Sequence, residues 1–492
     1  MKNVDNGEML QKAREYEKSQ LSKNEKVKRP EFHFSPPSGW INDPNGFSEF
    51  NGEYHLFFQY YPFENSWNSM HWGHTKTNDF IKWEYIPAAL APDKIYDNFG
   101  VFSGSAIEDN GKHVLMYTGV SEVEVEDNKK EIRQTQCIAI GDGIEYTKID
   151  KNPVIKADML PKGSSLVDFR DPKMWKEDGI YYSVVGSRAD DGSGQIALFS
   201  SENLIDWEFC SIIDKCNNEY GKMWECPDLF KLEDNHILMV SPQDMLADGL
   251  EFHNGNGTMF IVGNYDNKTK SFKRESVQSV DYGLDFYAPQ TMKTSDGRRI
   301  MVAWLKSWDN NICIDGSSWI GMMTLPRELK ICQGRVIQNP VKEIENYYLN
   351  KYTFENFDMG IQNSIDELNG RIFDLKIDIH EGSYGKFEIK LAQNEKYYTA
   401  IRYDFEEQVL TFDRTYSGLC RDFNSTRSMF VKNKNGKVKI RILLDRYSVE
   451  IFANDGTSAM TSVITTPEQA KNITWNVQGK VIADIEKNDI KL

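Results

Sequence analysis

Hydrophobic and polar residues alternate in short runs along most of the chain, and this pattern predicts β-strands rather than long helices. Between Phe32 and about residue 340, aromatic and β-branched runs are separated by Asn-Gly, Asp-Gly and similar pairs. Such pairs accept the positive backbone angles of tight hairpin turns. We therefore expect the central part of the chain to consist of consecutive antiparallel hairpins.

A helical spacing is found near the N-terminus instead. Met9, Ala13 and Tyr16 follow one another at i, i+4 and i+7 among charged residues, which predicts a helix over about residues 6–24. We expect residues 1–29 to form a short helical extension packed on the main body, with a partly frayed tail as the alternative.

The hairpins recur as a repeated unit. A short polar motif, a turn pair and an apolar strand follow one another five times, with the turns starting at residues 51, 110, 178, 234 and 296. Each interval is long enough for a four-stranded blade with its loops. The repeat predicts a five-bladed β-propeller over residues 30–340; an irregular β-sandwich with unrelated hairpins is the alternative.

Strict alternation of apolar and polar residues replaces this texture after about residue 350. It is typical of half-buried antiparallel strands. The alternating apolar positions are Phe373, Leu375, Ile377, Ile379, Phe387, Ile389, Leu391, Val438, Ile440, Ile442, Leu444, Val449 and Ile451. Residues 341–492 are therefore predicted to form a β-sandwich, and the fold class of the whole chain is all-β.

Composition narrows the range of partners. With 58 Lys and Arg against 74 Asp and Glu, the net charge of −16 disfavours nucleic acid as the main partner. No apolar run approaches the ~18 residues of a membrane span, and we expect no secretory signal. The seven cysteines form no CxxC pair, which indicates reduced thiols. We expect a cytoplasmic protein without a membrane partner, and a homodimer is one open assembly.

Three acidic residues stand at the start of repeats. Asp43, Asp171 and Glu225 open the first, third and fourth hairpins, so a propeller would bring them to one central funnel. Asp43 and Asp171 directly precede a proline, whereas Glu225 precedes its proline by two positions. Carboxyl groups gathered among aromatic residues suit glycoside hydrolysis, in which one protonates the leaving oxygen and another attacks or activates water. Acids near turns that are merely solvated or capping are the alternative.

Other chemistries have weaker support in the sequence. His71 and His74 form the one close histidine pair, but no glutamate lies between them and the region is rich in β-strand formers, which disfavours a metal site. GxGxxG, Walker A and GxSxG motifs are absent. Cys226 has no evident histidine partner and is interpreted as a packing residue. No metal or organic cofactor is expected.

Six segments resemble the signatures of glycoside hydrolase family 32, the invertases and fructanases. They are Trp40-Ile41-Asn42-Asp43-Pro44-Asn45-Gly46, Phe102-Ser103-Gly104-Ser105, Phe169-Arg170-Asp171-Pro172, Trp224-Glu225-Cys226-Pro227, Asp285-Phe286-Tyr287-Ala288-Pro289-Gln290 and Ser448-Val449-Glu450-Ile451-Phe452-Ala453-Asn454-Asp455-Gly456. The resemblance runs from about Arg29 to the C-terminus in the same order and spacing. It implies a five-bladed propeller followed by a β-sandwich, in agreement with the repeat.

The resemblance also implies roles for single residues. Asp43 would be the nucleophile that attacks the anomeric carbon of a fructofuranosyl unit, Glu225 would be the acid/base, and Asp171 would bind fructose hydroxyls and stabilise the transition state. The residues implied to bind or shape the sugar site are Asn42, Gln59, Trp67, Phe102, Ser103, Arg170, Tyr287 and Trp304. No phosphate-binding cluster is evident, and His33 and Lys306 are the candidates that could be named.

The expected function is a retaining β-fructofuranosidase acting on sucrose, sucrose 6-phosphate or a short fructo-oligosaccharide. The alternatives are a fructosyltransferase using the same site, a non-catalytic carbohydrate-binding propeller, and an inverting five-bladed glycosidase acting on arabinans. The predicted sandwich carries no comparable group of acids, so we expect it to support the propeller and to supply no catalytic acid; Glu450 is the residue that tests this.

Overall fold

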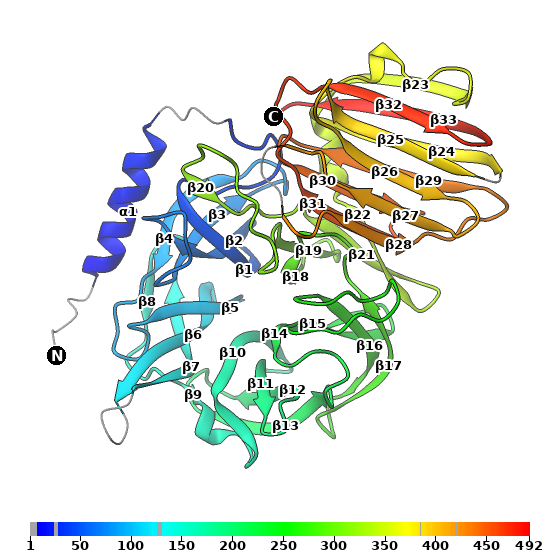
Figure 1. Ribbon diagram of the computed structural model, residues 1–492. Helices are drawn as coiled ribbons and strands as arrows, with labels where there is room; N and C mark the ends of the chain where they lie inside the picture. Colours follow the sequence, from blue (N-terminus) through cyan, green and yellow to red (C-terminus); the bar gives the residue numbers. More distant parts are fainter. Residues whose placement is uncertain (1–6, 24–27, 125–129, 384, 419–421) are drawn as a thin grey trace.

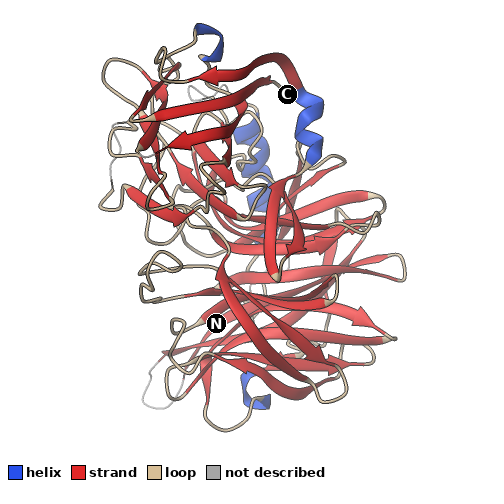
Figure 2. Cartoon of the chain, turned by 90° about the vertical axis from the view of Figure 1, so that its right-hand side faces the viewer, coloured by secondary structure: helices blue, strands red, loops and turns tan. Residues whose placement is uncertain are grey.

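The computed structural model describes residues 7–23, 28–124, 130–383, 385–418 and 422–492. Five sheets are arranged around a common centre, and two further sheets stack on one another beside them (Figure 1). Figure 2 shows the two bodies from the side, with strands as the main secondary structure of both. The predicted five-bladed propeller followed by a β-sandwich is confirmed.

Each blade is a sheet whose first strand in the chain lies nearest the centre. The first blade contains β20 (Trp319–Ile320), β1 (Gly39–Phe50), β2 (Glu53–Tyr61), β3 (His71–Thr77) and β4 (Glu84–Leu90). The second contains β5 (Gly100–Asp109), β6 (Lys112–Glu124), β7 (Lys130–Gly141), β8 (Tyr146–Lys148) and β9 (Ile155–Lys156). The third contains β10 (Ser164–Glu177), β11 (Ile180–Ala189), β12 (Gly194–Ser201) and β13 (Trp207–Lys215). The fourth contains β14 (Trp224–Leu232), β15 (Asn235–Pro242), β16 (Met259–Asp266) and β17 (Ser271–Ser279). The fifth contains β18 (Tyr287–Lys293), β19 (Arg299–Trp304), β21 (Arg327–Cys332) and β22 (Arg335–Pro340).

The turn between the first two strands of a blade explains why the repeat was visible in the sequence. In the first blade, Asn51 and Gly52 take φ values of 52° and 78°, which a two-residue type I′ turn requires. The fourth blade has no glycine in its turn, and Glu233 takes the positive φ of 54° instead. This turn therefore begins one residue before the predicted position, Asp234.

The ring is closed by β20, a short strand of the first blade that the chain forms between two strands of the fifth. β20 lies in the chain between β19 and β21, yet it pairs in parallel with β1, with Gly39 opposite Trp319 and Trp40 opposite Ile320. Backbone hydrogen bonds thus join the last blade to the first, next to the segment that carries Asn42 and Asp43.

The N-terminal helix α1 (Glu8–Leu21) covers the outer edge of the first blade. Arg14 donates from Nε to the carbonyl oxygen of Ala88 at 2.9 Å, and Glu17 accepts from the amide of Ala88 at 3.0 Å. Both unpaired backbone groups of this edge residue are therefore satisfied by helix side chains. Burial raises the pKa of Glu17 to about 7. The predicted helix ends, 6 and 24, lie outside the described residues.

The sandwich consists of a six-stranded and a five-stranded sheet. The first contains β23 (Tyr348–Asp358), β33 (Lys480–Ile490), β24 (Phe373–Ser383), β29 (Val438–Leu444), β30 (Ser448–Ala453) and β31 (Ser458–Val463). The second contains β28 (Thr426–Phe430), β27 (Val409–Asp413), β26 (Thr399–Asp404), β25 (Lys386–Gln393) and β32 (Asn472–Val477). The alternating apolar residues predicted from the sequence all lie in its core. Short 3-10 helices span Ala157–Met159, Lys342–Tyr347 and Asp366–Leu368, and no described helix is long and apolar enough to cross a membrane.

Buried ion pairs join the sandwich to the propeller. Arg327 of the fifth blade donates to Asp281 at 2.9 Å and to Glu450 of β30, and Glu450 also contacts His33 at 2.8 Å. His33 contacts Asp445 at 2.9 Å through its other ring nitrogen. All these side chains are fully buried.

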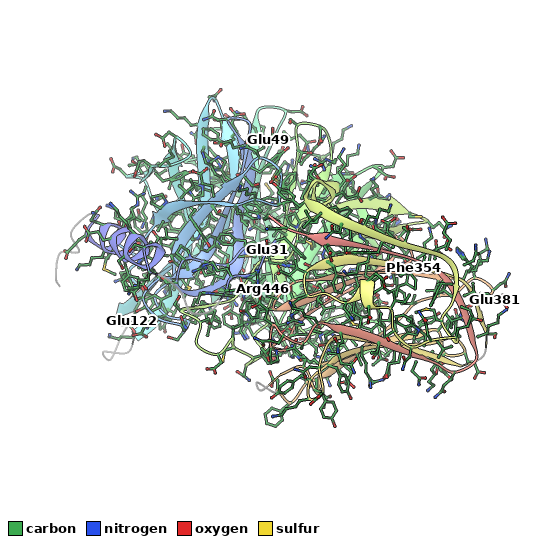
Figure 3. All side chains as sticks on the ribbon, turned by 90° about the horizontal axis from the view of Figure 1, so that it is seen from above. Glu31, Glu49, Glu122, Phe354, Glu381 and Arg446 are labelled. Carbon is green, nitrogen blue, oxygen red and sulfur yellow. The ribbon has the colours of Figure 1, made fainter. Side chains whose placement is uncertain are left out.

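A further ion pair lies at the edge of the same junction. Glu31 and Arg446, which Figure 3 labels close together between the two bodies, pair at 2.7 Å. The backbones of the two bodies also meet at Gly283 of the propeller and Thr461 of the sandwich. A Cβ on Gly283 would lie 1.9 Å from the carbonyl oxygen of Thr461, so only glycine fits there. The propeller and the sandwich therefore share one packed interface.

Candidate active site

The innermost strand of every blade has a break in its pairing register at the position of a predicted site motif. The residues at these breaks are Asp43, Ser103, Asp171, Cys226 and Ala288. In four of the five blades the next residue is a proline, which cannot donate to a sheet and is tolerated at such irregularities. A bulge turns its side chain out of the sheet and increases the local twist. The repeated bulge is therefore what directs these side chains toward the centre.

The bulge positions explain why the sequence motif around Glu225 is shifted by one residue relative to those around Asp43 and Asp171. Cys226, not Glu225, occupies the bulge of the fourth blade, with φ of 48°, as Asp171 does in the third with φ of 67°. Glu225 instead corresponds to Arg170 and Tyr287, each of which precedes the bulge of its own blade. The acids thus come from two adjacent positions of the same repeated motif.

Asp43 receives three hydrogen bonds at the centre of the propeller. Ser103 donates to its Oδ2 at 2.6 Å and Asn42 donates to its Oδ1 at 3.0 Å. The thiol of Cys226 lies 3.5 Å from Oδ2. Hydrogen bonds to a carboxylate favour its charged form, and they also fix the direction of its free lone pairs.

Asp171 is held beside Asp43 by the fourth blade. The backbone amide of Cys226 donates to Oδ2 of Asp171 at 3.0 Å, and the thiol of Cys226 lies 3.7 Å from the same atom. The amide of Asp171 donates to Thr118 of the second blade at 2.9 Å. Cys226 therefore links the two aspartates, and it also packs with Tyr287 and Trp304, as expected of a packing residue.

Glu225 has a different set of partners. Arg170 donates from Nε to Oε1 at 3.0 Å, while Tyr287 donates to Oε2 at 2.6 Å and Gln243 donates to the same oxygen at 3.0 Å. Arg170 is itself fixed by Asp168, 3.2 Å from its Nη1. Gln243 follows the last residue of β15, and no motif in the sequence indicated it.

The three acids form one electrostatic unit. Burial raises the pKa of Asp43, and the charge of Glu225 raises it further, against the hydrogen bonds from Ser103, Asn42 and Cys226. Burial and Glu225 likewise raise the pKa of Asp171, although Arg170 opposes the shift. The charge of Glu225 therefore acts on the ionisation of both aspartates.

Aromatic side chains surround this cluster. Trp304 is fully buried and packs with Cys226 and Tyr287. Trp304 also contacts Trp308, whose exposed fraction is 39%, with ring centroids 5.1 Å apart. Trp40 stacks on Trp308 at 6.1 Å. Trp40 and Trp308 were not predicted as site residues, although Trp40 opens the first signature segment.

Three of the predicted sugar-contacting residues lie between the first and second blades. Trp67 has an exposed fraction of 40% and meets Phe102 edge to face, with centroids 5.9 Å apart. Gln59 is buried and donates to the carbonyl oxygen of Val101 at 2.9 Å, so its amide is engaged with the backbone next to Phe102. The contacts thus place Trp67 against Phe102 and the amide of Gln59 on the backbone next to Phe102.

The two residues named as candidates for binding a phosphate group lie away from the acid cluster. His33 is enclosed at the junction with the sandwich, and the ammonium group of Lys306 is buried against the carbonyl oxygens of Asn310 and Ile312. Neither is free to bind a phosphate group there. Among the described residues, no group of three or more His, Cys, Asp or Glu side chains is arranged to hold a metal ion.

Comparison with known proteins agrees with this architecture. The description "Glycosyl hydrolases family 32 N-terminal domain" matches residues 33–340, and "Glycosyl hydrolases family 32 C terminal" matches residues 343–491. A sucrose-6-phosphate hydrolase of Zymomonas mobilis is 36% identical over 92% of this chain and 90% of its own length. A raffinose invertase of Escherichia coli is 36% identical over 88% of this chain and 89% of its own. The solved β-fructofuranosidase of Bombyx mori covers 99% of both chains with a TM-score of 0.85 and 30% identity. The chain belongs to glycosyl hydrolase family 32.

Proposed function

We propose that this protein is a retaining β-fructofuranosidase that hydrolyses the terminal fructosyl bond of sucrose, sucrose 6-phosphate or short fructo-oligosaccharides. The observation that carries the proposal is that Asp43, Asp171 and Glu225 meet at the centre of the propeller with separate hydrogen-bond partners. Two carboxyl groups with different environments are what a double-displacement glycosidase needs.

In the first step, Asp43 attacks the anomeric carbon of the fructosyl unit and forms a covalent ester. The bond to the leaving oxygen breaks as this bond forms. Ser103 and Asn42 hold the carboxylate of Asp43 from opposite oxygens, which orients it for attack. The thiol of Cys226 adds a weak donor to the same group.

Glu225 donates its proton to the leaving oxygen in this step, and in the second step it takes a proton from the water that cleaves the ester. Tyr287, Gln243 and Arg170 hold both of its oxygens, so that proton transfer occurs from a fixed position. We expect the carboxyl groups of Asp43 and Glu225 to lie about 5–5.5 Å apart, as retention requires.

Asp171 takes no part in bond making in this scheme. It binds fructose hydroxyls and stabilises the positive charge that develops on the ring, while Trp67 and Phe102 line the approach. A fructosyltransferase would use the same covalent step and pass the fructosyl unit to a sugar. Product analysis at high sucrose concentration separates the two activities.

Chemical rescue tests the assignment of roles. With a fructoside that has a good leaving group, Glu225→Ala should form the covalent ester but hydrolyse it slowly. Azide needs no general base and should restore its turnover, giving the β-azide. Asp43→Ala should not be rescued, and Glu275→Ala, an exposed acid of the fourth blade, should behave as wild type. Rescue of Asp43→Ala with formation of the α-azide would require the two roles to be exchanged.

A second assay narrows the substrate. Values of kcat/KM on sucrose, sucrose 6-phosphate, kestose and inulin would rank the leaving groups. A chain that binds these sugars without releasing fructose would contradict the proposal and support the non-catalytic alternative.

A further inference from the structure

One exposed aromatic side chain near the acid cluster of Asp43, Asp171 and Glu225 belongs to none of the motifs found in the sequence. It is Trp308, whose exposed fraction is 39%. A single exposed apolar residue is ordinary on a protein surface. Trp308 differs from such a residue in its position beside the acids and in the way its loop is held.

The course of β19 puts Trp308 at the same end of the propeller as the acids. β19 ends at Trp304, which pairs with Tyr287, the first residue of β18. Tyr287 donates to Glu225 at 2.6 Å. The chain therefore leaves the sheet beside the proposed acid/base, and Trp308 lies in the loop that follows, residues 305–318.

A row of three tryptophan rings connects this loop to the acids. Trp308 contacts Trp304 with ring centroids 5.1 Å apart, and it lies over Trp40 at 6.1 Å with an angle of 23° between the ring planes. Trp40 donates from Nε1 to Asn42 at 2.9 Å, and Asn42 donates to Asp43 at 3.0 Å. Trp304 is fully buried and Trp40 is partly buried, so Trp308 is the outermost ring of the row.

The loop that carries Trp308 is fastened to the propeller and to the sandwich. Asn256 of the fourth blade donates to Asp309 through its backbone amide at 2.6 Å and through its side chain at 2.9 Å. The amide of Asn311 donates to Asp422 of the sandwich at 2.7 Å. These bonds lie next to Trp308 on its C-terminal side, so its ring is held in place before any ligand binds, which lowers the entropy cost of binding.

The same loop is bonded to the loop of Trp67, which was expected to shape the sugar site. Asn65 donates to the carbonyl oxygen of Ser317 at 2.9 Å. Trp67 has an exposed fraction of 40%, close to that of Trp308. Two exposed tryptophans near the acids are thus carried by loops that are joined to each other.

An exposed ring in this position suits the leaving group of the substrate. The fructosyl unit has to bring its anomeric carbon to Asp43, so the sugar attached to it lies further from Asp43, as Trp308 does. The glucopyranosyl ring of sucrose carries most of its hydroxyl groups equatorially, and its faces therefore consist of C–H groups that pack on an aromatic ring. A fructofuranosyl ring carries hydroxyl or hydroxymethyl groups on both of its faces.

We propose that Trp308 is a specificity-determining residue that packs against the glucosyl leaving group of sucrose. The inference rests on the proposed β-fructofuranosidase activity and names the kind of leaving group that the site prefers. Trp308 touches none of the reacting atoms in this scheme. It selects among fructosides by the group that is attached to the fructosyl unit.

Values of kcat/KM for wild type and Trp308→Ala on three fructosides test this. The substrates are sucrose, inulobiose, whose leaving group is fructose, and methyl β-fructofuranoside, whose leaving group is not a sugar. On sucrose, Trp308→Ala should lose at least about tenfold, because one stacking contact is removed. On methyl β-fructofuranoside it should lose less than about twofold, because the reacting groups are unchanged. The loss on inulobiose should be intermediate.

Two further variants separate the aromatic contact from other effects. Trp308→Phe keeps an aromatic ring and should lose less on sucrose than Trp308→Ala does. Phe430→Ala is the matched control, since Phe430 is an aromatic residue of β28 in the sandwich with an exposed fraction of 58%. It should behave as wild type does on all three substrates.

The outcomes distinguish this inference from the proposed function. If wild type released fructose from none of the three substrates, the proposed function itself would fall. If wild type hydrolyses them, equal losses on sucrose and methyl β-fructofuranoside in Trp308→Ala would show that Trp308 acts through Trp40 and Asn42, and would overturn the inference. An unchanged kcat/KM on sucrose would overturn it too. A loss on inulobiose as large as that on sucrose would refute the preference for a glucosyl ring.

Discussion

The pH dependence of stability should reveal the buried histidine at the junction of propeller and sandwich. His33 lies between Asp445 and Glu450, with ring nitrogens 2.9 Å and 2.8 Å from their carboxylates. Burial alone would lower its pKa, but the hydrogen bonds and charges of Asp445 and Glu450 raise it to about 9. The pKa of Glu450 is lowered partly by the same pairing with His33, so the pKa shifts of Glu450 and His33 are not added as separate stabilising contributions.

The size of the effect follows from linkage. The pKa of a histidine in an unfolded chain is about 6.5. Protonated His33 therefore contributes its full stabilisation below that pH, and the contribution is lost as the pH rises through 9. The contribution is about 3 kcal/mol at about pH 6, about 2 kcal/mol at about pH 7.5 and below ~0.5 kcal/mol at about pH 9.5. His33→Gln removes the charge and keeps a hydrogen-bonding side chain.

Urea unfolding of wild type and His33→Gln at these three pH values measures the difference. We expect the gap between the two proteins to shrink by about 3 kcal/mol from the lowest to the highest pH. His380→Gln is the matched control, because His380 also pairs with an aspartate, Asp484, but is partly exposed in the sandwich. A gap that stays constant with pH would refute a charged His33, and the junction would then be held by neutral hydrogen bonds.

Three further predictions use other buried groups. Glu225→Gln removes a charge that, together with burial, raises the pKa of Asp43, so the acid limb of ester formation, followed by leaving-group release from an activated fructoside, should move to lower pH; an unmoved limb would show that the charge of Glu225 does not act on Asp43. Burial lowers the pKa of His113 to about 3, so its protonation opposes folding below about pH 6.5. When the pH falls from about 7.5 to about 5, His113→Gln should lose ~2 kcal/mol less stability than wild type. A difference in urea midpoint between the two proteins that does not change with pH would contradict this. Arg14→Ala should expose α1 to limited proteolysis and cost ~1–2 kcal/mol of its docking energy, whereas the exposed Lys12→Ala should not.

The number of blades could be predicted from the sequence because each hairpin is determined by the residues of its own turn. Each turn pair, such as Asn51-Gly52, fixes a hairpin by the backbone angles that its own residues accept. The acids were found for the same reason, since each lies in a short motif shortly before the turn of its own blade. Alternation in β24 predicted the sandwich core because one face of each strand is buried.

What could not be predicted depends on contacts between distant segments. The bulge that places Cys226 beside Asp171 changes the register by one residue, and only the paired strands reveal it. Gln243 contacts Glu225 from the end of a neighbouring strand, where no motif marks it. His33 was named as a phosphate candidate, but its partners lie more than 400 positions away along the chain.

The junction also explains how a sandwich without an acid in the cluster can affect the site. Asp285, two residues before Tyr287, accepts from Arg414 at 2.6 Å and from the amide of Val463 at 2.7 Å, both in the sandwich. The segment that enters β18 is therefore fixed from outside the propeller. Tyr287 in turn donates to Glu225 at 2.6 Å, so the position of the proposed acid/base depends on this anchor. The carboxylate of Glu450 pairs with Arg327 and His33 and so does not reach the acid cluster. The sandwich therefore acts on the site by positioning the backbone at the start of β18.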